Sequence, residues 1–189
     1  MEEMQGTAKD GGAWRMSRWR VTTWGVAALI LLLPLATGAP WTGSDFAFAG
    51  ILLLVPLGIY ELVVRRTGDL TYRTGAGIAL VATVLLLWVS GAVGIADSEA
   101  DLLYFLALAV GVVGVFVARF RPQRMAYAMF ATALALASAG AASLVAGMVP
   151  ARNSASEILV ITGFFVVLFI VSALLFWEAA RGEPERWAV

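Results

Sequence analysis

Six apolar runs, each close to the length of a membrane-crossing helix, follow one another along the chain with only short polar links between them. The runs cover residues 21–38, 45–64, 74–95, 101–120, 125–148 and 157–178. A helix needs about 20 mainly apolar residues to cross the hydrocarbon core of a bilayer, so each run can form one span. Because 61% of the 189 residues are hydrophobic, a water-soluble domain of this size could not bury them all. The sequence therefore predicts an all-α fold, an integral membrane bundle of six transmembrane helices in contact with a lipid bilayer.

The basic residues predict the orientation of the six spans. Twelve of the thirteen Lys and Arg residues fall on one side of a six-span chain, and only Arg152 falls on the other. The twelve are Lys9, Arg15, Arg18, Arg20, Arg65, Arg66, Arg73, Arg119, Arg121, Arg124, Arg181 and Arg186. Cytoplasmic segments of membrane proteins carry such an excess. We therefore expect a flexible cytoplasmic N-terminal tail over residues 1–18, the transmembrane domain over 19–181 and a cytoplasmic C-terminal tail over 182–189.

The first apolar run also permits a second interpretation. Its basic start and the small residues 36–39 are compatible with a cleaved signal peptide. Loss of that run would place the two tails on opposite sides of the membrane, so we expect it to be retained. Met16 is an alternative translation start.

Each outer link ends in a capping box, which places a hydroxyl at the N-cap and a carboxylate three residues later. The boxes are Thr42–Asp45, Ser98–Asp101 and Ser154–Glu157, and successive boxes are 56 residues apart. The carboxylate answers the partial positive charge of a helix N-terminus. The constant spacing fits a triplicated helical hairpin, and it also fits three unrelated hairpins that cross one bilayer thickness.

Two groups of charged residues are functional candidates. Glu61 lies near the inner end of its span, one turn before Arg65, where the pair shares a helix face. A proton or cation relay is one interpretation, and an interfacial ion pair is the favoured one. Asp97, Glu99 and Asp101 place three carboxylates within five residues, which could attract Ca²⁺. A solvated acidic loop is the favoured interpretation of that cluster.

Small residues in two runs predict close helix packing. Ala107 and Gly111, then Gly114 and Ala118, repeat at a spacing of four, and Gly140 lies in the alanine-rich run that follows. Small side chains let helix backbones approach closely in lipid. This packing face could form the centre of the bundle or dock another membrane protein. The last run is bulkier and is expected to face lipid; its phenylalanines are Phe164, Phe165, Phe169 and Phe176.

The sequence lacks the residues that most catalytic and metal sites need. It contains no Cys and no His, and its single lysine is Lys9. Disulfides, thiolate or imidazole metal sites and the commonest general base are thereby excluded. No phosphate-binding glycine loop and no nucleophile elbow is present. We expect no enzymatic activity, no cofactor, no metal and no nucleic-acid partner.

Several stretches carry a resemblance to known proteins. They are residues 18–20 with 24–25, 31–35, 91–95, 114–121 with 130–135, and 163–165 with 172–176. Over residues 16 to 181 the chain resembles a family of six-helix bacterial inner-membrane proteins. The resemblance implies a bacterial inner-membrane location and brings no activity with it.

Two functions from different classes follow from these observations. The first is a structural or accessory subunit that packs against another integral membrane protein or against itself. The alternative is a small transporter or channel for a neutral or lipid-like solute. Pro34 and Pro56 lie inside spans, where proline kinks a helix. These kinks and a set of intramembrane hydroxyls allow the alternative; the hydroxyl residues are Thr83, Ser90, Thr132, Ser138, Thr162 and Ser172.

Overall fold

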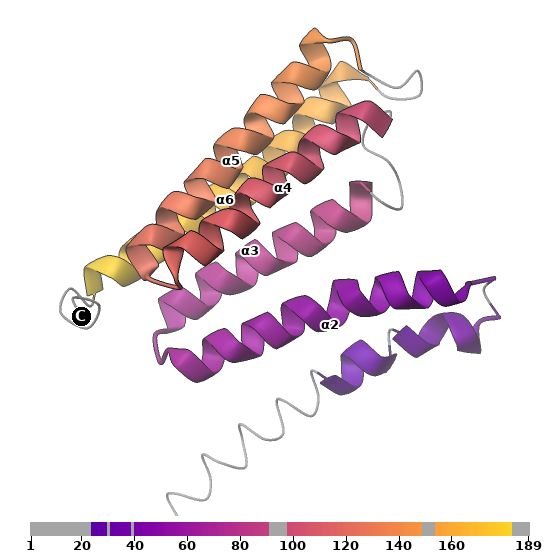
Figure 1. Cartoon of the computed structure of the whole chain (residues 1–189), viewed down its shortest axis with the longest axis horizontal. Helices are drawn as coiled ribbons and strands as arrows, with labels where there is room; N and C mark the ends of the chain where they lie inside the picture. Colours follow the sequence, from indigo (N-terminus) through magenta and orange to yellow (C-terminus); the bar gives the residue numbers. More distant parts are fainter. Residues whose placement is uncertain (1–23, 30, 39, 91–97, 149–153, 183–189) are drawn as a thin grey trace, which may run out of the picture. The chain divides into compact units, whose positions relative to one another are not determined.

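The structure is a computed structural model that describes residues 24–29, 31–38, 40–90, 98–148 and 154–182. For residues 98–100 it describes the backbone only. Regular structure in these ranges is helical throughout (Figure 1). The chain divides into two compact units, Met1–Val55 and Pro56–Val189. The boundary falls inside helix α2, Gly43–Arg66, which stays helical through Pro56.

The first unit contains a short apolar helix and the first half of α2. Residues 24–29 and 31–36 are helical, and Thr37 ends this segment by donating its hydroxyl to the carbonyls of Leu33 and Pro34, at 3.1 and 3.2 Å. Gly38 follows with φ +66°, a left-handed conformation that glycine adopts without a Cβ penalty. The chain then reaches the N-terminus of α2.

The second unit contains the rest of α2 and four further helices. These are α3 (Leu70–Trp88), α4 (Ser98–Ala118), α5 (Pro122–Val145) and α6 (Ala155–Gly182). Their ends follow local capping chemistry and therefore differ by a few residues from the apolar runs. Asp69 caps α3 by accepting from the Thr71 amide at 2.8 Å, so α3 starts before residue 74. Pro122 opens α5 because the first helical position needs no N–H, so α5 starts before residue 125.

Five of the helices are long and apolar enough to cross a membrane. They are Gly43–Arg66, Leu70–Trp88, Asp101–Ala118, Pro122–Val145 and Ala155–Gly182. The sixth apolar helix, Trp24–Ala36, is shorter, and residues 21–23 and 30 of the predicted first span lie outside the described residues. The fold is thus all-helical with five candidate spans, as expected of a multi-pass membrane protein, and the first span stays a prediction.

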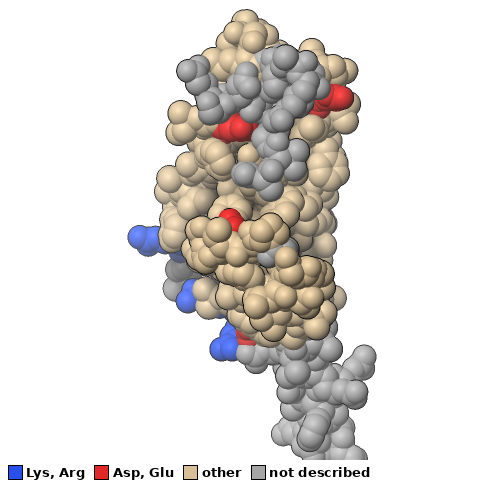
Figure 2. Space-filling view, turned by 90° about the vertical axis from the view of Figure 1, so that its right-hand side faces the viewer, with Lys and Arg blue, Asp and Glu red and all other residues tan. Residues whose placement is uncertain are grey.

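Helix α5 is the central helix of the second unit. It packs against α4 and α6, and α6 in turn packs against α3 (Figure 1). Its alanines and glycine make it narrow on several faces, and in lipid that permits close approach of two neighbours at once. On the face drawn in Figure 2, most of the described side chains are uncharged.

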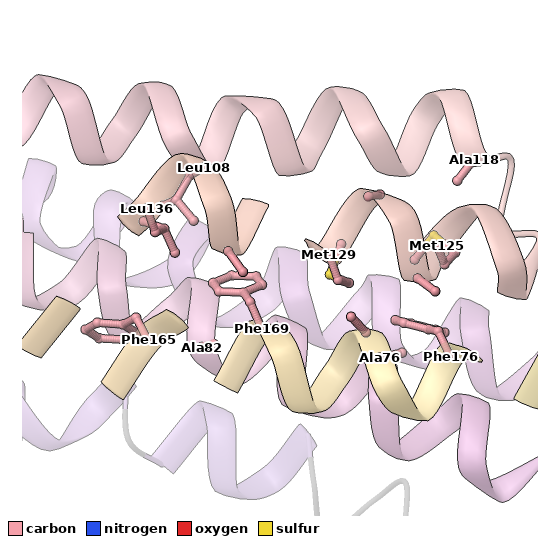
Figure 3. Close-up of a cluster of buried hydrophobic side chains, with 14 of the residues drawn as sticks. Ala76, Ala82, Leu108, Ala118, Met125, Met129, Leu136, Phe165, Phe169 and Phe176 are labelled. Atoms are coloured by element: carbon pink, nitrogen blue, oxygen red, sulfur yellow. The ribbon is translucent and has the colours of Figure 1, made fainter. Parts of the chain in front are cut away.

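Helix α6 places its phenylalanines differently from the sequence prediction. Phe165, Phe169 and Phe176 are buried, and only Phe164 is exposed, at 52%. The three share one face because they are four and seven residues apart. They gather in one cluster with Met129 of α5 and other buried residues (Figure 3). The expectation that this helix turns its phenylalanines to lipid is therefore wrong for three of the four.

The reason is complementary size between neighbouring helices. Gly75 of α3 would bring an added Cβ to 3.3 Å from Leu175 Cβ and 3.6 Å from Phe176 Cδ2. Ala76 and Ala82 continue the same cluster along α3. Small residues on α3 and α5 leave the space that large rings on α6 fill, and such contacts supply the dispersion energy that replaces the hydrophobic effect in lipid.

Candidate functional site

The structure joins the two charged residues predicted on α2. Arg65 donates to Glu61 Oε1 at 2.9 Å, one turn apart on the helix. The arginine side chain is 63% exposed and the glutamate side chain 17% exposed. This geometry fits an arginine that extends its charge outward from the helix end, and the pair is a local contact of α2.

Of the three predicted acidic residues, only Asp101 has a described side chain, so their clustering stays a prediction. Asp97 lies outside the described residues, and Glu99 belongs to α4 but its side chain is outside them too. Asp101 is half-buried in the first turns of α4. Within the described ranges no group of three or more Asp or Glu side chains could hold a metal ion.

Two of the three capping boxes can be traced atom by atom. The Ser154 amide donates to Glu157 Oε2 at 3.0 Å, and the Glu157 amide donates to Ser154 Oγ at 3.3 Å. At the start of α2 the Thr42 amide donates to Asp45 Oδ2 at 2.7 Å, and the Thr42 hydroxyl donates to the same oxygen at 2.8 Å. Ser98 is itself the first residue of α4, and its side chain lies outside the described residues. These carboxylates satisfy helix ends.

The predicted packing face lies at helix contacts. Ala107, Gly111 and Ala118 are buried along α4. A Cβ added at Gly111 would come 2.7 Å from Thr132 Oγ1 of α5, and one added at Gly114 would come 2.8 Å from Ala128 Cβ. Distances under 3.0 Å are closer than van der Waals contact allows, so these glycines set how near α4 and α5 approach.

Gly140 plays the same part between α5 and α6. A Cβ there would lie 2.7 Å from Thr162 Cγ2 and 3.0 Å from Thr162 Oγ1. By contrast, a Cβ added at Gly163 would meet no atom within 4 Å. Gly140 therefore permits the close approach of α5 and α6, whereas Gly163 does not contribute to it.

A buried hydroxyl cluster joins three helices beside Gly140. We use this name for Tyr104 of α4, Ser143 of α5 and Thr162 of α6. The Tyr104 hydroxyl hydrogen-bonds the Thr162 hydroxyl at 2.7 Å, across 58 residues of sequence. Ser143 lies within hydrogen-bonding range of Tyr104 and donates to the Ala139 carbonyl at 2.8 Å. The cluster was missed in the sequence because nothing in the spacing of these residues signals that they meet.

At the opposite end of the second unit, a second tyrosine, Tyr72, links α3 to the turn between α4 and α5. The Tyr72 hydroxyl of α3 donates to the Phe120 carbonyl at 2.8 Å, and its ring meets Phe176 edge-on at 4.8 Å between centroids. Arg119 and Phe120, which link α4 to α5, have φ of 49° and 59°. This left-handed turn is unfavourable for residues with a Cβ, and the bond from Tyr72 helps hold it.

Backbone carbonyls supply two further links between helices. Ser172 of α6 donates its hydroxyl to the Gly75 carbonyl of α3 at 2.8 Å. Arg73 of α3 donates to the carbonyls of Val64 and Thr67 at 2.7 and 2.9 Å. The cation thus binds the C-terminal end of α2, where the helix dipole favours positive charge.

The charged residues of the second unit are distributed unevenly between its Tyr72 end and its Tyr104 end. The end near Tyr72 carries most of the arginines, together with Glu61, Asp69 and Glu178; the arginines are Arg65, Arg66, Arg73, Arg119, Arg121, Arg124 and Arg181. The described charged residues at the Tyr104 end are Asp101 and Glu157. The basic end unites the C-termini of α2, α4 and α6 with the N-termini of α3 and α5.

These features define an all-helical protein with several candidate membrane spans and a hydroxyl-bonded, glycine-packed core. Comparison with protein-family models, curated proteins and solved structures found no match. We therefore infer the function from the contacts described above.

Proposed function

We propose that this chain is a multi-pass protein of the bacterial inner membrane that acts as a structural or accessory subunit. It has six spans, both termini in the cytoplasm, and packs against another integral membrane protein or a second copy of itself. The uneven distribution of arginine between the two ends of the second unit supports this orientation, because cytoplasmic ends carry the excess of basic residues.

The use of the buried hydroxyls is the observation that carries the proposal. Tyr104, Ser143 and Thr162 bond one another or a carbonyl, and Thr132 and Ser172 each donate to a carbonyl at 2.8 Å. A solute pathway would need polar groups that are available to the solute. Here these groups join helices or satisfy their own helix, so the interior serves packing.

The outward faces of the unit leave apolar area for lipid or for a partner. Helix α4 exposes a row of large apolar residues; it comprises Leu102, Phe105, Leu106, Val110, Val112, Val113, Phe116 and Val117. An accessory subunit requires such a surface, since helix association in lipid depends on packing contacts.

A mild-detergent purification of the full chain tests the proposal. We expect a C-terminally tagged protein to co-purify with a second membrane protein, or to run as a dimer or larger oligomer after in-membrane cross-linking. A single monomeric species, combined with solute flux in proteoliposomes, would replace the accessory role with the transport role.

One observation favours the alternative of a small transporter or channel for a neutral or lipid-like solute. Ser90, in a π-helical turn after α3, has the one buried side-chain oxygen in the described residues that lacks a hydrogen-bond partner. π-Helical turns are frequent at functional sites. If flux is found, Ser90→Ala should lower it while leaving purification and helicity unchanged; equal flux in Ser90→Ala would remove Ser90 from the pathway.

A further inference from the structure

An arginine–aromatic cluster lies at the basic end of α5 and α6. It consists of Arg124 and Tyr127 on α5 and Trp177 and Arg181 on α6. The rings of Tyr127 and Trp177 meet edge-on, with centroids 5.7 Å apart. The guanidinium carbon of Arg181 lies 6.0 Å from the centroid of the Trp177 ring. Arg124, Tyr127 and Arg181 are exposed, and Trp177 is half-buried.

Helix geometry places the two arginines on the same side of the aromatic pair. Arg124 precedes Tyr127 by three residues, and Arg181 follows Trp177 by four. The two helices run in opposite directions, so both offsets point toward the same end. At 1.5 Å per residue, each arginine backbone lies about 5 Å beyond the rings along its helix.

No carboxylate neutralises either of these two arginines within the described protein. Arg65 binds a carboxylate of its own helix, and Arg73 binds two backbone carbonyls. Among the described residues neither Arg124 nor Arg181 has an ion pair. Glu178 is an exposed acid one turn from Arg181 but does not pair with it either.

We infer that the arginine–aromatic cluster binds the headgroup phosphate of an anionic phospholipid. Tryptophan and tyrosine favour the headgroup level of a bilayer, which would place the two guanidinium groups among lipid phosphates. Guanidinium matches the planar, two-point geometry of a phosphate better than ammonium does. The inference rests on the proposed membrane placement and adds a defined ligand class to it.

Lipid retention by the purified full chain tests the inference. The protein, in mild detergent, is incubated with equal amounts of phosphatidylglycerol and phosphatidylcholine, and bound lipid is measured by native mass spectrometry. We expect wild type to retain phosphatidylglycerol preferentially. The double variant Arg124→Gln with Arg181→Gln removes two positive charges. It should lower the preference for phosphatidylglycerol over phosphatidylcholine roughly tenfold or more.

A matched control removes the same charge elsewhere at this end. Arg66→Gln with Arg119→Gln eliminates two exposed arginines of the same end that lie outside the arginine–aromatic cluster, and it should keep the wild-type preference. Equal loss in both double variants would mean that bulk charge attracts the lipid, which overturns the inference. Inorganic phosphate should not displace the lipid; displacement would make free phosphate the ligand and overturn it as well.

A second variant decides the outcome if the glutamine variant fails to fold by circular dichroism. Arg124→Lys with Arg181→Lys keeps the charge and removes the two-point geometry, so it should retain an intermediate amount of phosphatidylglycerol. Retention equal to wild type would contradict the guanidinium–phosphate contact. A chain absent from the membrane fraction would refute the proposed function, whereas a membrane-bound chain without lipid preference refutes this inference alone.

Discussion

At the residue scale, the same residue type has different roles according to what lies opposite it. Gly140 and Gly163 belong to helices that pack against each other, but only Gly140 sits where a Cβ would meet a neighbouring side chain. Arg65 and Arg73 are both near the ends of α2 and α3, and one binds a carboxylate whereas the other binds backbone carbonyls. Substitutions at such residues should therefore be judged by their contacts.

Gly140→Ala should destabilise the protein, because the new Cβ would lie 2.7 Å from Thr162 Cγ2. Overpacking of this kind costs about 1–3 kcal/mol. Gly163→Ala is the matched control: it meets no atom within 4 Å and should be neutral or slightly stabilising through helix propensity. Thermal unfolding in detergent compares the two variants. If Gly140→Ala unfolds at or above the wild-type temperature, the helices can separate there without loss and the packing argument fails.

Glu61→Gln should have little effect on stability. The partner arginine side chain is 63% exposed, and helix pairs of this kind contribute about 0.3–0.5 kcal/mol. The measurement is thermal unfolding in detergent together with ion flux in proteoliposomes, with Arg65→Gln as the control from the other side of the pair. Loss of a proton- or cation-coupled flux in a folded Glu61→Gln protein would assign a functional role to this carboxylate.

At the element scale, close glycine approaches and hydrogen bonds from hydroxyls occur beside one another in two of the helix contacts. Between α5 and α6 the glycine is Gly140, and Thr162, which it faces, bonds Tyr104 of α4. Between α3 and α6 the glycine is Gly75, whose carbonyl accepts from Ser172. Close approach brings the donor and acceptor together, so packing is the condition on which the hydrogen bond depends.

Tyr104→Phe should therefore cost less than filling a glycine contact. Hydrogen bonds between helices in lipid average about 0.6 kcal/mol, and the Thr162 hydroxyl can turn to a carbonyl of its own helix. Ser138→Ala is the control, because Ser138 is exposed and donates only within α5, to the Leu134 carbonyl at 2.9 Å. A double-mutant cycle of Tyr104→Phe and Thr162→Val gives the coupling between the two residues. Additive effects would show that the 2.7 Å contact contributes nothing to stability.

Gly111→Leu should disrupt the contact of α4 with α5, since even a single Cβ would meet Thr132 Oγ1 at 2.7 Å. The larger side chain must push the helices apart, and we expect reduced expression or aggregation in detergent. Gly163→Leu, at an open position, should express as wild type. If both variants give comparable size-exclusion profiles, α4 and α5 can accommodate a leucine at residue 111 without loss of stability, and the prediction is wrong.

At the scale of the whole molecule, the charges separate the two ends of the helices. Reporter fusions at residue 97 and after Val189 should read outside and inside the cytoplasm, respectively, if six spans obey the arginine distribution. A fusion after residue 68, in the link between α2 and α3, should agree with the one after Val189. Opposite readings, or identical readings at residue 97 and Val189, would refute the six-span topology.

Local sequence features by themselves determined where the helices form and how their N-termini are capped. Five predicted spans correspond to α2 to α6 because a bilayer-length apolar run has few alternatives to a helix. Asp45 and Glu157 bind the N-termini that their spacing predicted, since capping is a contact within four residues. The pairing of Glu61 with Arg65 is local in the same way.

Only the tertiary structure decided which helices meet and which faces they bury. From the sequence, the bulky side chains of α6 were expected to face lipid. In the structure, Phe165, Phe169 and Phe176 instead fill space left by small residues that are distant in the sequence. The bonds from Tyr104 to Thr162 and from Tyr72 to Phe120 cross 58 and 48 residues and leave no local pattern. In an apolar helix nearly every face is hydrophobic, so periodicity carries little information about the buried side. Shape complementarity between helices makes that choice, and it exists only once they are packed.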